Sequence, residues 1–142
     1  MSSPAAIHAP AQSRNTRQRK AIREAFTGSG RPMNPAEVLS VASQAVSGIG
    51  IATVYRTIKS LLEDGWLVTV DLPGEVSRYE QAGKAHHHHF HCRGCDKVFE
   101  MHGCPGHEDE APDGFVVTGH EFVLFGYCAA CAQARHASAQ DS

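Results

Sequence analysis

The chain has 142 residues, of which 42% are hydrophobic and 20% are charged. This composition fits one or two small globular domains and argues against a disordered or membrane-spanning protein. The net charge of −2 conceals an asymmetry, because residues 1–62 contain eight Lys or Arg and two acidic residues, whereas residues 63–142 contain five and thirteen. The first half therefore predicts contact with nucleic acid, and the second half, which holds nine of the ten histidines, predicts cation binding.

No apolar run approaches the length of a transmembrane helix. The first residues also lack the charged start and apolar stretch of a signal peptide. We therefore expect a cytoplasmic protein with no membrane partner. In that reducing compartment, paired cysteines bind metal more often than they form disulfides.

The first elements predicted along the chain are two helices. Residues 1–13 are expected to be a flexible tail, after which Thr16 could cap a helix from about Arg17 to Phe26. A second helix is expected to start after Asn34 and to end near Ser47. There Pro35 suits the first helical position and Glu37 completes a capping box.

A third helix is predicted from about Ile51 to Asp64, with Gly65 as its stop. Its apolar residues recur at helical spacing and should face the core: Ile51, Val54, Ile58, Leu61 and Leu62. Two short strands follow, at Trp66–Leu72 and Ser77–Glu80. Three helices and a β-hairpin are the order of a winged helix, so residues 1–80 are predicted to form a winged-helix DNA-binding domain whose third helix enters the major groove.

The rest of the chain predicts a second, smaller domain. Residues 81–85 are expected to be a hinge and residues 86–142 a small α/β domain, which makes the fold class α+β. The expected strands are His88–Cys92, Lys97–Met101, Gly114–Thr118 and Glu121–Gly126. The residues from His136 onward are expected to be disordered.

Two Cys-x-x-Cys pairs lie in this second domain. Cys92 and Cys95 form the first, and Cys128 and Cys131 form the second after 32 intervening residues. Four thiolates in two such pairs match the ligands of a closed tetrahedral zinc site. The alternative is that the two cysteine pairs are redox-active or form disulfides. We expect a structural zinc ion that holds the two ends of the domain together.

The histidines beside the first pair exceed what a zinc site of four thiolates can use. Side chains alternate between the faces of a strand, so His87 and His89 should point one way and His86 and His88 the other. The first pair would form a regulatory metal site with Glu80 and Glu100. The second pair would form a possible further site with the following residues: His120, and Glu108 or His107. Imidazole with carboxylate suits zinc, iron(II), manganese or nickel.

The remaining sulfur and nitrogen groups are expected to be less important. Cys104 is interpreted as a free thiol in a loop, with a metal ligand or a redox sensor as the alternative. His91, His102 and His136 are expected to be surface residues.

A basic, polar face is predicted for DNA contact. Arg14, Arg17 and Arg19 lie at the start of the first domain, and the third helix adds Thr53, Tyr55, Arg56 and Lys59. Such side chains suit phosphates and base edges. The alternative, a solvated helix face, does not explain the basic charge of this half.

These motifs together resemble the ferric uptake regulator family. The resemblance rests on Ile51–Thr57, His86–Cys95 and His120–Cys131, and spans roughly residues 14–132. It implies a dimeric bacterial repressor with an N-terminal winged helix and a C-terminal dimerisation domain that binds metal. By position it implies a minor-groove role for Arg14, recognition-helix contacts by Tyr55 and Arg56, and the three metal sites described above.

The choice of metal rests on departures from the pattern of that family. Its iron and peroxide sensors usually have a histidine at the start of the second helix, where this chain has Met33. Four remaining ligands would suit tetrahedral zinc better than five- or six-coordinate iron, and the four-histidine run resembles the zinc uptake regulators. Yet zinc regulators commonly have a cysteine near Glu80, and this chain has none there.

We therefore predict a metal-dependent repressor, most similar to the zinc uptake branch, that binds a palindromic operator in double-stranded DNA as a homodimer. Its cofactors would be structural zinc and a second regulatory ion, with zinc favoured over iron(II) or manganese. An iron-, manganese- or peroxide-responsive regulator and a metal buffer or chaperone are the alternatives. A zinc hydrolase is disfavoured, so we expect neither enzymatic activity nor a small-molecule substrate.

Overall fold

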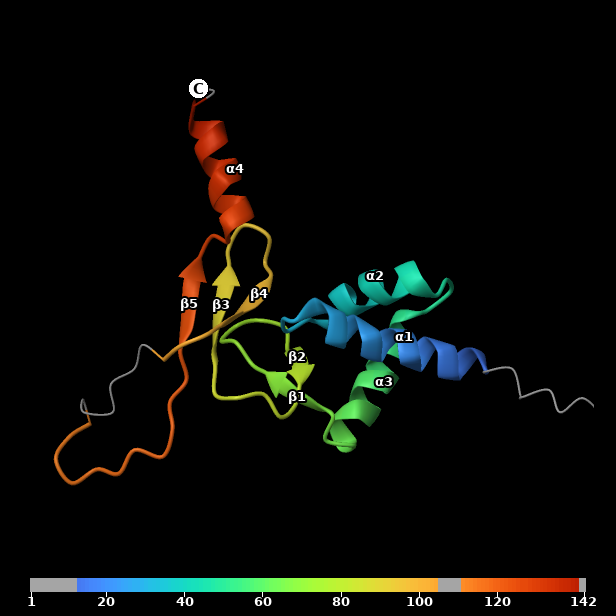
Figure 1. Ribbon diagram of the computed structural model, residues 1–142, viewed down its shortest axis with the longest axis horizontal. Coiled ribbons are helices and arrows are strands. Elements are labelled where there is room, and N and C mark those ends of the chain that lie inside the picture. Colours follow the sequence, from blue (N-terminus) through green and yellow to red (C-terminus); the bar gives the residue numbers. More distant parts are fainter. Residues whose placement is uncertain (1–12, 105–110, 141–142) are drawn as a thin grey trace, which may run out of the picture.

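The computed structural model describes residues 13–104 and 111–140, and its elements form two groups along the chain (Figure 1). The first group consists of α1 (Arg14–Ser29), α2 (Pro35–Ala45), α3 (Ile51–Glu63), β1 (Leu67–Val70) and β2 (Arg78–Gln81). The second consists of β3 (His88–Cys92), β4 (Val98–Met101), β5 (Val123–Gly126) and α4 (Ala129–Gln140). Helices beside small sheets confirm the predicted α+β class.

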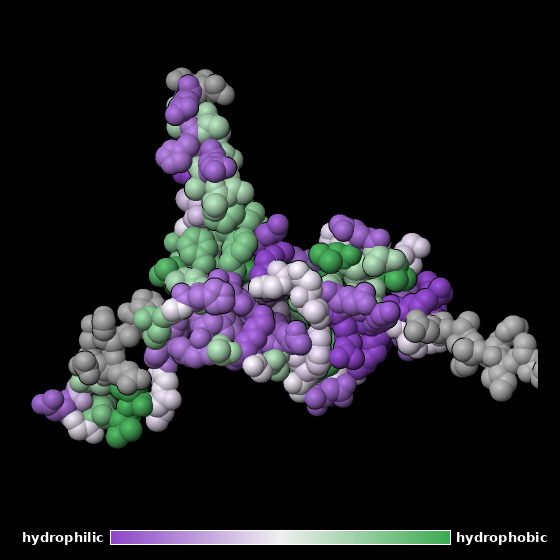
Figure 2. Space-filling view, in the orientation of Figure 1, coloured by the Kyte–Doolittle hydropathy of each residue, from purple (hydrophilic) through white to green (hydrophobic). Residues whose placement is uncertain are grey.

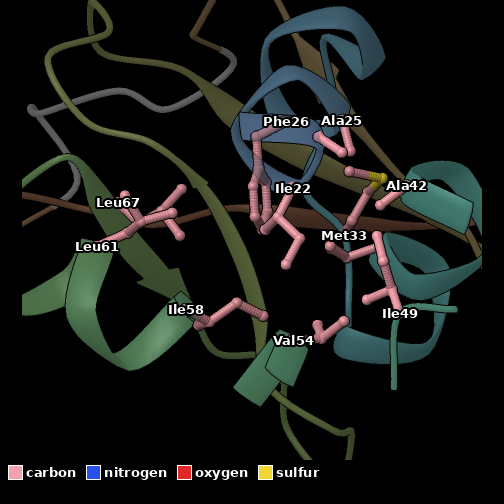
Figure 3. Close-up of a cluster of buried hydrophobic side chains, with 12 residues drawn as sticks. Ile22, Ala25, Phe26, Met33, Ala42, Ile49, Val54, Ile58, Leu61 and Leu67 are labelled. Atoms are coloured by element: carbon pink, nitrogen blue, oxygen red, sulfur yellow. The ribbon is translucent and has the colours of Figure 1, made fainter. Parts of the chain in front are cut away.

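The first group is built around one hydrophobic core (Figure 3). Strands β1 and β2 pair antiparallel, and their hairpin follows the three helices in the order of a winged helix. The predicted apolar face of α3 is confirmed at Val54, Ile58 and Leu61, which are buried. The prediction was wrong for Ile51, which is 43% exposed because the first turn of α3 extends beyond the packed core.

The helix ends follow local capping chemistry. The Oγ of Ser13 accepts a hydrogen bond from the Thr16 N–H at 3.2 Å, so α1 begins at Arg14, earlier than the predicted Arg17. The predicted tail lies outside the described residues, except for Ser13. The capping box of α2 is confirmed, because Asn34 Oδ1 accepts from the Glu37 N–H at 2.8 Å and Glu37 Oε1 accepts from the Asn34 N–H at 3.1 Å.

The second group contains a three-stranded sheet of order β4-β3-β5, in which β3 pairs antiparallel with β4 and parallel with β5. The strand predicted at Gly114–Thr118 is absent, and Phe115 and Val116 are 71% and 86% exposed. The aromatic and β-branched residues of this segment favour a strand, but no described segment pairs with it.

The prediction of disorder from His136 onward was wrong as far as Gln140. Helix α4 covers Ala129–Gln140 because its sequence is rich in alanine, the strongest helix former. The Cys128 carbonyl accepts from the Ala132 N–H at 2.8 Å and starts the helix. Residues 141–142 lie outside the described residues.

Helix α4 projects away from the rest of the chain (Figure 1) and buries none of its side chains. Apolar side chains gather at its base, over the adjoining β5 (Figure 2): Leu124, Phe125 and Tyr127 are 45%, 48% and 40% exposed. A search of the described residues finds no helix with the length and apolar character needed to cross a bilayer.

A charged cluster joins the β-hairpin of the first group to the turn between β3 and β4. The Arg78 side chain is 1% exposed, and its Nη2 lies 3.3 Å from Asp96 Oδ2 and donates to the Asp96 carbonyl at 2.8 Å. His91 Nε2 lies 2.6 Å from the other carboxylate oxygen, Oδ1. The expectation that His91 is a surface residue was therefore wrong: it is 5% exposed. His102 and His136 are exposed, as predicted.

Asp96 is the one non-glycine residue with positive φ (63°) among the described residues. That conformation favours glycine, so the carboxylate must compensate for it by pairing with Arg78 and His91. Glu75, His91 and Asp96 lie close enough to hold a cation, but the buried Arg78 guanidinium already supplies the positive charge there.

We expect Asp96→Asn to lower the free energy of unfolding by about 1–2 kcal/mol. Asparagine tolerates positive φ, so the change removes the charge that pairs with buried Arg78 while keeping the shape, and the partial exposure of Asp96 limits the effect. Urea unfolding, with zinc content measured in parallel, checks this result. Exposed Asp113 offers the matched variant Asp113→Asn, and equal stability of the two variants would contradict the role of Asp96.

Candidate metal sites and nucleic-acid face

The four paired cysteines converge on one point. Their sulfur atoms all lie within 4.8 Å of one another, and Cys95 Sγ is 3.9 Å from Cys128 Sγ. Tetrahedral zinc with Zn–S bonds of about 2.3 Å separates its sulfurs by about 3.8 Å. The spacing therefore matches a closed zinc site formed by the turn after β3 and the start of α4.

Backbone N–H groups support this cluster. Cys92 Sγ accepts from the N–H groups of Gly94, Cys95 and Cys128 at 3.4, 3.5 and 3.2 Å. Burial by itself would raise the pKa of Cys92, but these hydrogen bonds lower it to about 6. The hydrogen bond from Cys128, followed by other neighbouring cysteines and burial, raises the pKa of Cys131 to about 12. One thiolate is thus preformed, and a cation is needed to hold all four.

Gly94 has a structural role that the sequence patterns did not predict. A Cβ at this position would lie 2.8 Å from Cys131 Sγ and 2.9 Å from its Cβ, closer than packed atoms approach. The turn between Cys92 and Cys95 therefore requires glycine for the second cysteine pair to reach it. The presence of glycine between Cys92 and Cys95 was the feature of the sequence that could have indicated this requirement.

The second cluster joins the hairpin of the first group to β3. The ligand atoms of Glu80, His87 and His89 lie within 4.8 Å of one another, as strand alternation predicted. His87 Nδ1 is 2.8 Å from the Ala85 carbonyl oxygen, which can only accept, so Nδ1 carries a proton. In neutral His87 the lone pair of Nε2 then faces Glu80 Oε1 at 2.9 Å.

Two acceptors at that distance need a cation or a proton between them. His89 Nε2 lies 3.4 Å from the other Glu80 oxygen. Burial would raise the pKa of Glu80, but the hydrogen bonds and charges of the two histidines lower it overall. Burial would lower the pKa of His87, but its bond to Ala85 and the charge of Glu80 raise it overall. The donor set fits a divalent cation, with one carboxylate and two imidazoles.

Glu100 and Met33, the two other residues considered for this site, lie outside the cluster. Glu100 stands opposite His89 in the β3–β4 register, but its carboxylate pairs with Lys84, so the structure does not bring it into the cluster. Met33 is fully buried in the helical core (Figure 3) and offers no nitrogen or oxygen donor there. The described ligand set therefore has three members.

The third cluster lies on the other histidine face, as predicted. His86 Nε2 is 3.1 Å from His88 Nε2 and 3.0 Å from His120 Nε2. Cys104 Sγ lies 2.8 Å from His120 Nε2 and belongs to the same group, so its interpretation as a free loop thiol was wrong. The other expected members, Glu108 and His107, lie outside the described residues.

One cavity of about 470 Å³ connects the second and third clusters. Glu80, His87 and His89 line it together with the three histidines of the third cluster. Residues 69–72, at the end of β1, form part of its wall. Ions bound at these clusters would therefore lie between the two groups of elements.

The exposed face of α3 carries the side chains predicted to contact DNA. Tyr55 is 53% exposed, and Arg56 and Lys59 are exposed beside it. Arg56 Nη2 donates to the half-buried Thr53 Oγ1 at 3.1 Å. This face presents two cations and an aromatic ring on one helix, which suits the phosphates and base edges of nucleic acid.

The three predicted arginines of α1 are in different situations. Arg17 is exposed, and Arg14 Nη2 donates to the Gly48 carbonyl at 3.2 Å. Arg19 is bonded to Ser60 Oγ at 2.8 Å and paired with Asp64 at 3.1 Å. Arg19 therefore joins α1 to the end of α3, which leaves it less free to contact a ligand.

The chain is similar in sequence to known proteins. Residues 10–124 match the model of the ferric uptake regulator family. The ferric uptake regulation protein of Campylobacter jejuni is 31% identical over 122 residues, covering 82% of this chain and 78% of that protein. The chain belongs to the ferric uptake regulator family. It is thus a metal-responsive transcriptional regulator, and the family resemblance predicted from its motifs is confirmed.

Solved structures of ferric uptake regulator relatives share the fold. A zinc-bound manganese uptake regulator is 28% identical with a TM-score of 0.68, covering 78% of this chain and 87% of that one. The Helicobacter pylori ferric uptake regulator, described as having three functional metal-binding sites, is 25% identical with a TM-score of 0.60, covering 81% and 79%. The two relatives are named for different metals, manganese and iron.

Proposed function

We propose that this chain is a repressor that senses zinc and binds a palindromic DNA operator as a homodimer. The observation that carries the proposal is the contact of Glu80 with His87 and His89. Glu80 lies on β2 of the hairpin, and the histidines lie at the start of the second group of elements. A ligand set that spans this connection makes the position of the helical domain depend on the ion.

The proposed roles of the clusters differ. Cys92, Cys95, Cys128 and Cys131 would hold structural zinc, because four thiolates leave no open coordination position. Glu80, His87 and His89 would hold the regulatory ion, with Glu100 as a further ligand if it leaves Lys84. Bound there, the ion supplies the positive charge that removes the repulsion between the Glu80 carboxylate and the imidazole lone pairs.

The mechanism follows from what these side chains do without that charge. His87 Nε2 and Glu80 Oε1 then attract each other only when the imidazole is protonated, so the hairpin is held less firmly against β3. The populated orientations of the helical domain broaden, and fewer of them place two α3 helices at the spacing of an operator. Tyr55, Arg56 and Lys59, with Arg14, Arg17 and Thr53, would make the DNA contacts.

Homodimer formation is supported by the second group of elements. The exposed apolar side chains of β5 adjoin a helix, α4, that buries nothing within its own chain. A second copy of the chain would cover this surface and fix the two DNA-binding domains about a two-fold axis, which matches a palindromic operator. The proposed division into residues 1–80, 81–85 and 86–142 places this surface in the dimerisation domain.

Zinc is favoured by the size of the ligand set. Two imidazoles and one carboxylate need one further donor to complete four-coordinate zinc, whereas iron(II) or manganese at the same set would need more than one. A metal buffer or chaperone would leave the basic face of α3 without a role. The carboxylates of Glu80 and Glu100 are already engaged by histidine and by lysine, which argues against their use as a general base and for a protein that is not an enzyme.

The test is DNA binding by purified protein that retains structural zinc, with free zinc, iron(II) and manganese each titrated at buffered levels against a panel of palindromic duplexes. We expect binding that is switched on by zinc at the lowest free concentration. A response to iron(II) or manganese alone would replace zinc as the sensed metal. Binding that is independent of all three would contradict the regulatory proposal.

A further inference from the structure

The third cluster contains a ligand that the histidine pattern does not predict. Cys104 follows β4, and His120 precedes β5, so the cysteine and the histidine come from opposite edges of the three-stranded sheet. They meet at His86, which stands just before the central strand β3. One sulfur and three ring nitrogens lie within 4.8 Å of one another.

The three imidazoles form an arrangement that is costly without a cation. His86 Nε2 faces two other Nε2 atoms, at 3.0 and 3.1 Å, and a neutral ring can donate from only one of its nitrogens. A cation would convert this crowding of lone pairs into coordination, since nitrogens around tetrahedral zinc are separated by about 3.3 Å.

His88 is the ligand that must rearrange. The Phe122 N–H donates to His88 Nδ1 at 3.2 Å, so in the metal-free chain the proton of His88 lies on Nε2, where His86 can share it. With a cation at Nε2, the proton of His88 would have to lie on Nδ1, and the hydrogen bond from the Phe122 N–H would be lost. An anionic ligand on the opposite side of the cluster compensates for this cost.

We infer that the Cys104 thiolate is that ligand, and that His86, His88, His120 and Cys104 form a zinc site with one sulfur and three nitrogen donors. The inference rests on the proposed function only for the regulatory meaning of the site, because the ligand set stands on its own geometry. A thiolate is a soft donor that favours zinc over manganese, which prefers carboxylate and water. The cluster thus selects the metal through a residue outside the histidine run.

The number of thiolates makes this site different from the four-cysteine site. The third cluster offers one thiolate, from exposed Cys104, whereas the other site offers four. A cation at the third cluster would therefore be held less firmly and would exchange more readily than the structural ion. This difference allows cobalt(II) to probe the third cluster while zinc stays in the four-cysteine site.

The test is a cobalt(II) titration of the full chain with zinc retained in the four-cysteine site, followed by absorption spectroscopy. Cobalt(II) bound to a thiolate gives a sulfur-to-metal charge-transfer band, and the Glu80 cluster has no sulfur, so the band reports the third cluster alone. We expect the band in the unmodified chain and its loss in Cys104→Ser, with cobalt affinity at this site reduced at least about 10-fold. Zinc content is measured throughout to exclude exchange at the four-cysteine site.

Two further variants separate the outcomes. His120→Ala should also remove the band, whereas His102→Ala, which changes an exposed histidine outside the cluster, should leave it unchanged. A full band and unaltered affinity in Cys104→Ser would overturn the inference. DNA binding that ignores metal, together with a band that depends on Cys104, would refute the proposed function and leave this ligand assignment intact.

Discussion

Replacing Cys95 by serine is expected to remove the structural zinc and unfold the second group of elements. Four-thiolate zinc connects the turn after β3 to the start of α4, and α4 has no buried side chain to hold it otherwise. Zinc binding contributes about 10–16 kcal/mol to folding in small zinc domains, which equals or exceeds the whole stability of a typical domain, about 5–15 kcal/mol. We expect loss of one zinc per chain and loss of the cooperative thermal transition of this region.

The matched control is Cys104→Ser, which removes one thiol from the other cysteine-containing cluster. It should keep the structural zinc and the thermal transition, because Cys104 lies outside the four-cysteine group. Metal analysis and calorimetry of the two variants side by side make the comparison. Unchanged zinc content and melting of Cys95→Ser would disprove the structural role of the cluster.

Replacing His89 by alanine is expected to leave a folded protein that no longer responds to the regulatory metal. His89 is one of the three described ligands of the cluster that contains Glu80. Removal of a group that only supports a metal ligand already lowers metal affinity about 10–100-fold. Loss of a direct ligand should cost at least about 100-fold. DNA binding measured against buffered free zinc should shift to correspondingly higher concentrations.

The control for this result is an exposed histidine outside the clusters. His102→Ala should bind DNA with the zinc dependence of the unmodified chain, because His102 is exposed and belongs to none of the clusters. Circular dichroism and the content of structural zinc in the four-cysteine site should be equal in both variants. If His89→Ala keeps full zinc-dependent binding at unchanged free zinc, the Glu80 cluster is not the regulatory site.

The local parts of the fold were the most predictable. The capping box of Asn34 and Glu37 and the buried face of α3 follow from side-chain chemistry within a few residues, and both are confirmed. The start of α1 was misplaced because Ser13 and Thr16 are both good caps, and only the hydrogen bond from the Thr16 N–H to Ser13 Oγ decides which one caps the helix. Helix α4 was not predicted, although its sequence is rich in alanine, the strongest helix former.

The candidate sites divide in the same way. Alternation along β3 places His87 and His89 on one face and His86 and His88 on the other, and cysteine spacing alone indicates the four-thiolate cluster. Their partners depend on pairing between distant segments. Cys104 reaches His120 across the sheet, and Lys84 competes for Glu100, and neither contact has a sequence signature.

The sequence by itself therefore determined the family, the order of the helices and strands from α1 to β4, and the residues of two clusters, because each depends on spacing within one element or on a repeated motif. The tertiary structure alone decided which segments meet. Three features arise where segments separated in sequence are brought within a few ångströms: the pairing of Asp96 with buried Arg78, the glycine required beside Cys131, and the convergence of Cys104 on three histidines. Such contacts depend on sheet register and turn geometry, which local patterns do not encode.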